Sequence, residues 1–174
     1  MVAQPTRVCA EISAEQEYRE KAAFLTNFPS FVEWPREAFS SPQSPLSVCV
    51  FGSYSFGISL AESVGGKTVQ GRRMDVRRVH TESELRACHI LFVSHSEEKH
   101  YAAVLQEIQG ASVLTVGETP GFLAAGGAVN FLLQQDALQF EVNLDSANVA
   151  HLKISANMLA LARRVVGKTV EAKN

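Results

Sequence analysis

Small or polar residues that could contact a ligand follow three of the apolar runs in this sequence. They are Ser53 and Tyr54, Ser94 and His95, and Gly117 and Glu118. The apolar runs are rich in β-branched and aromatic residues, which is typical of buried strands in a parallel sheet. In open α/β sheets, ligands bind at the carboxyl ends of the strands. We therefore predict a ligand-binding cleft formed by these six residues.

Histidines near potential nucleophiles could support catalysis, but the sequence completes no such pair. Cys88 and His89 are neighbours on a predicted strand, so their side chains point to opposite faces and cannot form a nucleophile–base pair. His95 could meet a partner from another loop, but the chain has no Gly-x-Ser-x-Gly nucleophile turn. We predict no catalytic residues. A hydrolase that uses Ser94 or His95 is the enzymatic alternative.

Metal and nucleotide binding are both disfavoured by the spacing of the relevant residues. His95 and His100 are five residues apart, so they do not share one face of a helix. Residues 61–68 and 162–169 each end in Gly-Lys-Thr, as a phosphate-binding loop does. Such a loop must follow a strand and open a helix, whereas these two stretches end predicted helices. We predict no metal and no cofactor.

The composition is that of an ordinary globular chain. It has 174 residues, of which 46% are hydrophobic and 20% charged, and its formal net charge is −2. This charge gives no bulk attraction for nucleic acid or for an anionic membrane. No apolar run reaches the roughly 18 residues that a membrane span needs, so we expect no direct membrane insertion. Residues 1–10 lack the apolar segment of a secretory signal, which is therefore absent or already removed.

Alternating helix and strand patterns predict one α/β domain over residues 13–167. Residues 1–12 are predicted to be disordered and residues 168–174 to be frayed. Strands are expected at 46–52, 69–79, 88–96, 112–116, 128–133 and 138–143, and helices at 13–28, 58–64, 81–86, 97–109 and 156–166. We predict a three-layer sandwich, Rossmann-like or flavodoxin-like, with a mostly parallel sheet and a C-terminal antiparallel hairpin. The 88–96 run is its central strand.

Aromatic residues recur at helical spacing from Phe24 to Trp34. By default this pattern predicts packing of a helix against the sheet. However, Trp34 and Pro35 lie past the expected helix end, which Pro29 sets. The alternative is an exposed rim that binds a protein partner. The residues assigned to this rim are Phe31, Glu33, Trp34 and Pro35.

The three cysteines leave two readings open. Cys49 and Cys88 lie on predicted strands, and Cys9 lies in the N-terminal segment. In a cytosolic protein, buried strand cysteines usually act as small hydrophobic residues. The alternative is a disulfide between Cys49 and Cys88 that leaves Cys9 free.

An ordered set of short stretches resembles the YfiR family of small bacterial periplasmic proteins. The stretches are residues 21–28, 31–35, 48–52, 56–57, 71–72, 88–94, 114–116 and 140–143. The resemblance runs from about Lys21 to Val165 and implies a non-enzymatic periplasmic regulator. Such a protein binds the sensor domain of a membrane-bound diguanylate cyclase and represses it, which lowers cyclic di-GMP output.

The resemblance also implies roles for particular residues. It places a structural disulfide at Cys49 and Cys88, which replaces the cytosolic reading with a periplasmic one. It adds Glu141 and Asn143, from the stretch Phe-Glu-Val-Asn, to the predicted ligand cleft. The chain departs from the family at Pro29, which interrupts the first helix, and in lacking a second cysteine pair in its C-terminal half.

The main hypothesis from the sequence is therefore a periplasmic repressor of an inner-membrane diguanylate cyclase. Its expected partners are the sensor domain of that cyclase, a small-molecule ligand at the strand ends, and a second copy of the chain in a homodimer. The alternative is a periplasmic protein that binds a small ligand and has no cyclase partner.

Overall fold

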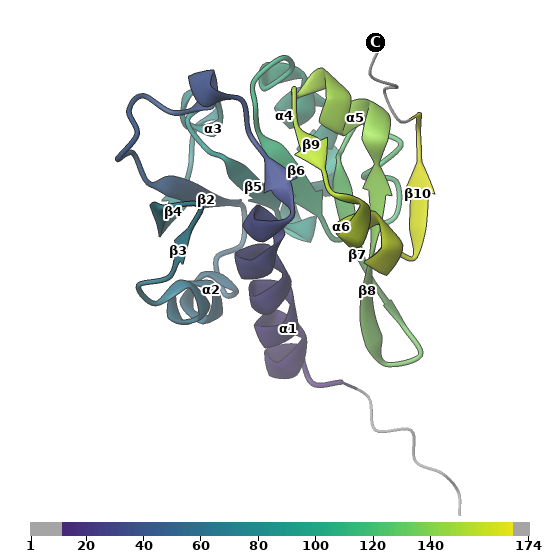
Figure 1. Cartoon of the computed structure of the whole chain (residues 1–174). Coiled ribbons are helices and arrows are strands. Elements are labelled where there is room, and N and C mark those ends of the chain that lie inside the picture. The colour runs from purple at the N-terminus through teal and green to yellow at the C-terminus, as the bar shows by residue number, and fades with distance from the viewer. Residues whose placement is uncertain (1–11, 169–174) are drawn as a thin grey trace, which may run out of the picture.

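An eight-stranded mixed sheet forms the centre of the structure (Figure 1), a computed structural model that describes residues 12–168. Its strand order is β10-β8-β7-β6-β5-β2-β4-β3. The strands are β2 (Leu46–Phe51), β3 (Thr68–Val69), β4 (Arg72–Val79), β5 (Ile90–Val93), β6 (Leu114–Gly117), β7 (Val129–Gln134), β8 (Ala137–Asn143) and β10 (Arg164–Val166). The strands β4, β2, β5, β6 and β7 are parallel, β8 is antiparallel to β7, and β10 is parallel to β8.

Helices cover both faces of this sheet. The α-helices are α1 (Ala14–Asn27), α2 (Gly57–Val64), α3 (Glu82–Leu85), α4 (Tyr101–Glu107), α5 (Leu144–Val149) and α6 (Ala156–Leu161). The 3-10 helices are η1 (Phe28–Ser30), η2 (Arg36–Ala38) and η3 (His95–His100). Apolar residues of α1, α2, α5 and α6 pack in one core, and those of α3 and α4 pack in a second core. The predicted three-layer α/β sandwich is confirmed.

The strand β5 separates the two cores, as expected of a central strand. Its residues Ile90 and Phe92 belong to the core under α1, and Leu91 and Val93 belong to the core under α4. All four side chains are buried. This is why the stretch reads as a continuous apolar run and not as an alternating one.

The first helix begins and ends where local sequence signals place it. Ser13 is its N-cap, and the Ser13 hydroxyl accepts a hydrogen bond from the backbone N–H of Gln16 at 3.1 Å. The helix ends at Asn27, and Pro29 lies in the 3-10 turn that follows. Its buried residues include Ala22 and Leu25, which face the sheet.

A disulfide joins Cys49 of β2 to Cys88, which precedes β5. The Cα atoms of the two cysteines are 5.9 Å apart, and the residues are 39 positions apart in sequence. The pairing that the family resemblance implies is confirmed. Cys9 lies outside the described residues, as do nearly all of the ends predicted to be disordered or frayed.

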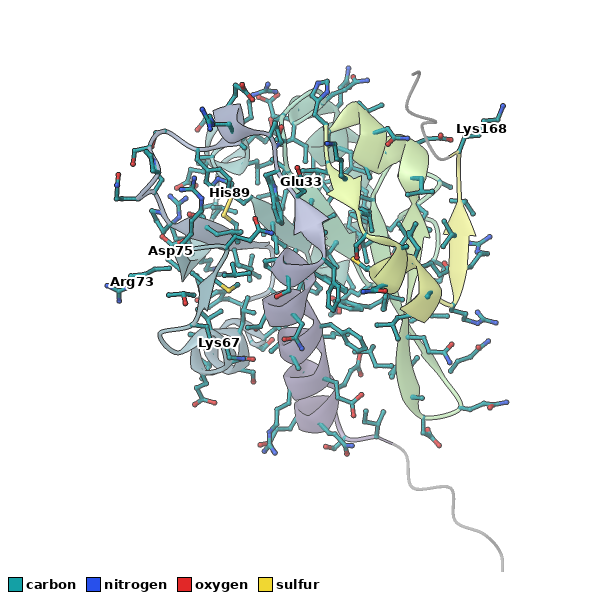
Figure 2. The ribbon with its side chains drawn as sticks, in the orientation of Figure 1. Glu33, Lys67, Arg73, Asp75, His89 and Lys168 are labelled. Carbon is teal, nitrogen blue, oxygen red and sulfur yellow. A yellow bond between two sulfur atoms is a disulfide. The ribbon has the colours of Figure 1, made fainter. Side chains whose placement is uncertain are left out.

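The predicted strand 69–79 is instead a hairpin of β3 and β4. The backbone turns back at Gln70 and Gly71, which both have positive φ. Because β3 has only two residues, most of β4 lies at the sheet edge, as its charges suggested. Figure 2 shows the Arg73 side chain reaching out from this edge.

The C-terminal helix is shorter than the predicted helix 156–166. It ends at Leu161, and the backbone of Ala162 is extended. The N–H of Arg163 then donates to the carbonyl of Phe140, and residues 164–166 pair with β8 as β10. Pairing with the sheet therefore overrides the helical pattern of this segment. The sequence reasoning also gave no element for α5, or for the two-residue strands β1 (Val32–Glu33) and β9 (Lys153–Ile154), which pair with each other.

Candidate functional site

A buried carboxylate, Glu118, lies at the carboxyl ends of the two central strands. It follows β6, and only 7% of its side chain is exposed. One oxygen accepts hydrogen bonds from the backbone N–H of His95 at 2.8 Å and from the His95 ring Nδ1 at 2.9 Å. The Ser94 hydroxyl donates to the same oxygen at 3.4 Å. Three of the six residues predicted at the strand ends are thus brought into direct contact.

The second oxygen of Glu118 pairs with Lys21, which reaches across from α1. The Lys21 ammonium lies 2.6 Å from this oxygen, and 5% of the lysine side chain is exposed. Lys21 also pairs with Glu17, one turn earlier on the same helix. The sequence analysis did not assign Lys21 to the site. The available signal was a lysine on the helix face that also carries Ala22 and Leu25.

Opposing effects act on the ionisation of this buried pair. Burial alone would raise the pKa of Glu118, but the charge of Lys21 and hydrogen bonds from Lys21 and His95 outweigh it, so the pKa is lowered. Burial alone would lower the pKa of Lys21, but hydrogen bonds and charge from Glu118 and Glu17 raise it. Both groups therefore stay ionised. The carboxylate binds α1 to the loop after β5 and is not free to act as a base.

Ser94 is oriented in a way that does not suit a nucleophile. Ser94 is buried, and its hydroxyl donates a hydrogen bond to the Glu118 carboxylate. The hydroxyl oxygen also accepts a hydrogen bond from the backbone N–H of Ser96 at 3.5 Å. A serine nucleophile needs a neighbouring base that takes its proton, usually a histidine. Among the described residues, the hydroxyl of Ser94 makes no hydrogen bond to a histidine.

The loop after β2 joins the same end of the sheet. The backbone N–H of Ser53 donates to the Ser96 hydroxyl at 3.0 Å. Gly52 has a φ of +98°, and a Cβ there would lie 2.6 Å from the Ser96 hydroxyl oxygen. This close approach requires glycine. Tyr54 instead covers the start of α2 and lies under the guanidinium of Arg78, which is 5.4 Å from its ring centre.

Gly117 has a packing role in the structure. It is the last residue of β6 and is buried. A Cβ at this position would lie 2.3 Å from the ring of Phe122, which covers it. Its assignment to a ligand-lining surface is therefore corrected, because the Phe122 ring occupies that space.

Glu118 and Glu141 line one cleft of about 500 Å³, which lies beyond the end of β6 and alongside β7. Asn130, Leu123 and Arg164 also line it. The carboxylate of Glu141 accepts two hydrogen bonds from Arg164, at 3.0 and 3.2 Å. The side-chain oxygen of Asn130 is buried and has no hydrogen-bond partner among the described residues. The sequence analysis missed Asn130 and Arg164.

Asn143 is the N-cap of α5. Its side-chain oxygen accepts the N–H groups of Asp145 and Ser146, at 3.1 and 3.3 Å, and its amide donates to the carbonyl of Leu123 at 3.4 Å. These bonds use both polar ends of the side chain. The structure therefore gives Asn143 a capping role.

The predicted exposed aromatic rim is corrected at Trp34. This side chain is 7% exposed and packs in the core, because β1 pairs with β9 and holds the segment against the domain. Phe31 and Pro35 are half-buried. Glu33 is exposed and lies 3.8 Å from Lys153.

Within residues 12–168, no group of three or more His, Cys, Asp or Glu side chains is placed to hold a metal ion. No helix in that range is both long and apolar enough to cross a bilayer.

Comparison with known families identifies the class of protein. Residues 18–163 match the YfiR/HmsC-like family, so the chain belongs to this family, and the resemblance noted from the sequence is confirmed. The family consists of regulators and not of catalysts, and it is associated with the periplasm and with diguanylate cyclase signalling.

Solved structures support the fold. A conserved domain protein from Vibrio cholerae O1 biovar eltor str. N16961 superposes with a TM-score of 0.59 at 8% identity. An ABC domain in complex with L-Trp from Streptococcus pneumoniae gives a TM-score of 0.55 at 9% identity. In each case the match covers 86% of this chain and 60% of the other. At these identities the similarity concerns the fold alone.

Proposed function

We propose that this protein is a non-enzymatic periplasmic regulator that binds the sensor domain of an inner-membrane diguanylate cyclase and holds the cyclase inactive. The observation that carries this proposal is membership of the YfiR/HmsC-like family over residues 18–163. The Cys49–Cys88 disulfide supports an oxidising compartment, where such bonds persist. The role of Glu118 supports it too, because that carboxylate joins structural elements and is not arranged for catalysis.

Repression requires more than tight binding. The regulator must bind the inactive conformation of the sensor domain more tightly than the active one, because a ligand shifts an equilibrium only by its difference in affinity. Phe31, Glu33 and Pro35 of the proposed rim are accessible for such a contact.

Titration with purified sensor domains tests the proposal. The periplasmic domains of the membrane-bound diguanylate cyclases of the source organism are each titrated with this protein by calorimetry. We expect one of them to bind with a dissociation constant of about 1 μM or below. If none binds at protein concentrations of about 100 μM, the proposal is refuted.

A second candidate is a small-ligand binding protein without a cyclase partner. The cleft lined by Glu118, Asn130, Glu141 and Arg164 favours it, because polar and charged side chains there could orient a small ligand. The Streptococcus pneumoniae domain of similar fold was solved with L-Trp, so amino acids belong in the screening panel. A ligand that raises the melting temperature of the wild type, and not of Asn130→Leu, would support this function.

A further inference from the structure

The helices α1 and α6 share one face of the sheet (Figure 1). An apolar groove lies between them. Its deeper part is a hollow of about 320 Å³. The apolar side chains that line it are Phe24, Phe28, Phe31, Phe140, Met158 and Leu161. The groove lies outside the Glu118 cleft and shares with the predicted rim only Phe31.

The shape of the hollow suits one apolar side chain of a protein partner. Its floor is closed, because Phe28, Phe140 and Met158 are almost fully buried. Phe31 is half-buried, and Leu161 at the rim is 67% exposed. The opening beside Leu161 leaves the hollow accessible from solvent. Anchor residues of protein interfaces fill such pockets.

The groove continues along α1 to an acidic end. A second hollow of about 420 Å³ shares Phe24 and Asn27 with the first and reaches Glu20 and Asp136, which is in the turn between β7 and β8. Within the described residues, neither hollow is lined by a lysine or an arginine.

The charge of Glu20 is not neutralised by its own helix. The other acidic residues of α1, Glu15 and Glu17, pair with Arg19 and Lys21. Among the described residues, the Glu20 side chain accepts a hydrogen bond only from the neutral Gln16 side chain, at 3.3 Å. Glu20 also lies four residues before Phe24, which is one helical turn or about 6 Å.

We propose that this groove is the contact surface for the cyclase sensor domain. An apolar side chain of the partner fills the hollow beside Leu161, and a lysine or arginine about one helical turn away faces Glu20 and Asp136. This inference rests on the proposed function and specifies where and by what chemistry the partner is recognised.

Matched substitutions test the groove. Leu161→Gln removes the apolar rim, and Ile58→Gln is its control, because Ile58 is 68% exposed on α2. The charge variant combines Glu20→Gln with Asp136→Asn, and Glu62→Gln on α2 is its control. All are surface changes, so circular dichroism should show wild-type folding and stability.

The assay is calorimetric titration of each variant with the sensor domain that binds the wild type. We expect Leu161→Gln to weaken binding at least about tenfold. The charge variant should weaken it about threefold at low ionic strength and not at high ionic strength. The controls on α2 should bind as the wild type does.

Several results would overturn the proposal, and they separate it from the proposed function. Equal binding by the wild type and Leu161→Gln refutes the groove and leaves the regulator function standing. No binding of any sensor domain to the wild type refutes both. A homodimer in sedimentation that Leu161→Gln dissociates assigns the groove to a second copy of the chain. Saturable binding of N-phenyl-1-naphthylamine that Leu161→Gln abolishes, without an effect on sensor-domain binding, assigns it to a small apolar ligand.

Discussion

Replacing Lys21 by methionine should destabilise the protein strongly, because it leaves the buried Glu118 carboxylate without its cation. The two side chains are 5% and 7% exposed and their charged atoms are 2.6 Å apart. Removing one partner of a buried ion pair costs about 3–5 kcal/mol. The remaining bonds from His95 to Glu118 compensate in part, so we expect about 3 kcal/mol. For a domain of this size, that lowers the melting temperature by roughly 6–12 °C.

The same helix provides the control. Arg19 pairs with Glu15 at the same i,i+4 spacing, but these two side chains are 68% and 73% exposed. Arg19→Met should therefore change the free energy of unfolding by less than about 1 kcal/mol. Urea unfolding at pH 7, followed by circular dichroism, measures both variants. If Lys21→Met costs no more than Arg19→Met, the assignment of Lys21 and Glu118 as a buried, stabilising pair is wrong.

Acid should reveal the same pair in the wild type. The pKa of Glu118 is lowered in the folded protein, so its ionised form stabilises the fold at neutral pH. That stabilisation is lost as the pH falls below the ordinary carboxyl range toward the folded pKa. In Lys21→Met, burial should instead raise the pKa of Glu118, so protonation would favour the folded state and this loss of stability in acid should disappear.

Three further changes have defined outcomes. The Cys49–Cys88 disulfide closes a loop in the unfolded chain and so lowers its conformational entropy. Reducing the bond removes this constraint, so the free energy of unfolding in urea should fall by about 4 kcal/mol. An unchanged transition midpoint would contradict this. Burial lowers the pKa of His89 below 6.5, so the stability of the fold should fall as the pH drops from 6.5. His89→Gln should flatten this pH dependence. A pH profile identical to that of the wild type would contradict the role of His89. Met158→Ala should cost about 2–5 kcal/mol, because Met158 is 1% exposed in the core; a loss below 1 kcal/mol would show that this site is loosely packed.

The effect of His89 follows from its contacts. Its Nδ1 accepts the backbone N–H of Ser47 at 3.0 Å, and its Nε2 donates to the carbonyl of Ala38 at 2.9 Å. The ring is therefore neutral in the fold and stacks on Phe39, with ring centres 4.4 Å apart. Protonation would break the bond to Ser47, so the unfolded chain takes up the proton more readily.

Elements with strong local signals could be predicted from the sequence. The strand β5 is buried on both faces, so all of its residues are apolar and the run is recognisable without an alternating polar pattern. The start of α1 at Ser13 and its end before Pro29 depend on bonds and steric limits within a few residues. The disulfide between Cys49 and Cys88 was implied by the family resemblance, because spacing alone left the cysteines open to two readings.

Elements that depend on distant contacts could not be predicted. The strand β10 forms because Arg163 and Arg164 find partners in Phe140 and Glu141, 23 residues earlier in the chain. Local pattern favoured a continuous helix there. The burial of Trp34 has the same kind of cause, since it follows from the pairing of β1 with β9.

The candidate site shows the same division. The rule for strand ends correctly brought Ser94, His95 and Glu118 together. The rule for strand ends could not include Lys21, because the burial of Lys21 depends on its contact with Glu118, 97 residues away in sequence. At sequence level, Glu17 and Lys21 had the spacing of an ordinary surface pair.

The most direct test of the regulatory role is a cyclase assay in a reconstituted membrane. The full-length diguanylate cyclase whose sensor domain binds this protein is placed in nanodiscs, and cyclic di-GMP formation is measured as the protein is added to the sensor-domain side. We predict a saturable fall in the rate of formation that follows the occupancy of the sensor domain. A rate that stays constant when the sensor domain is saturated would contradict the proposed function.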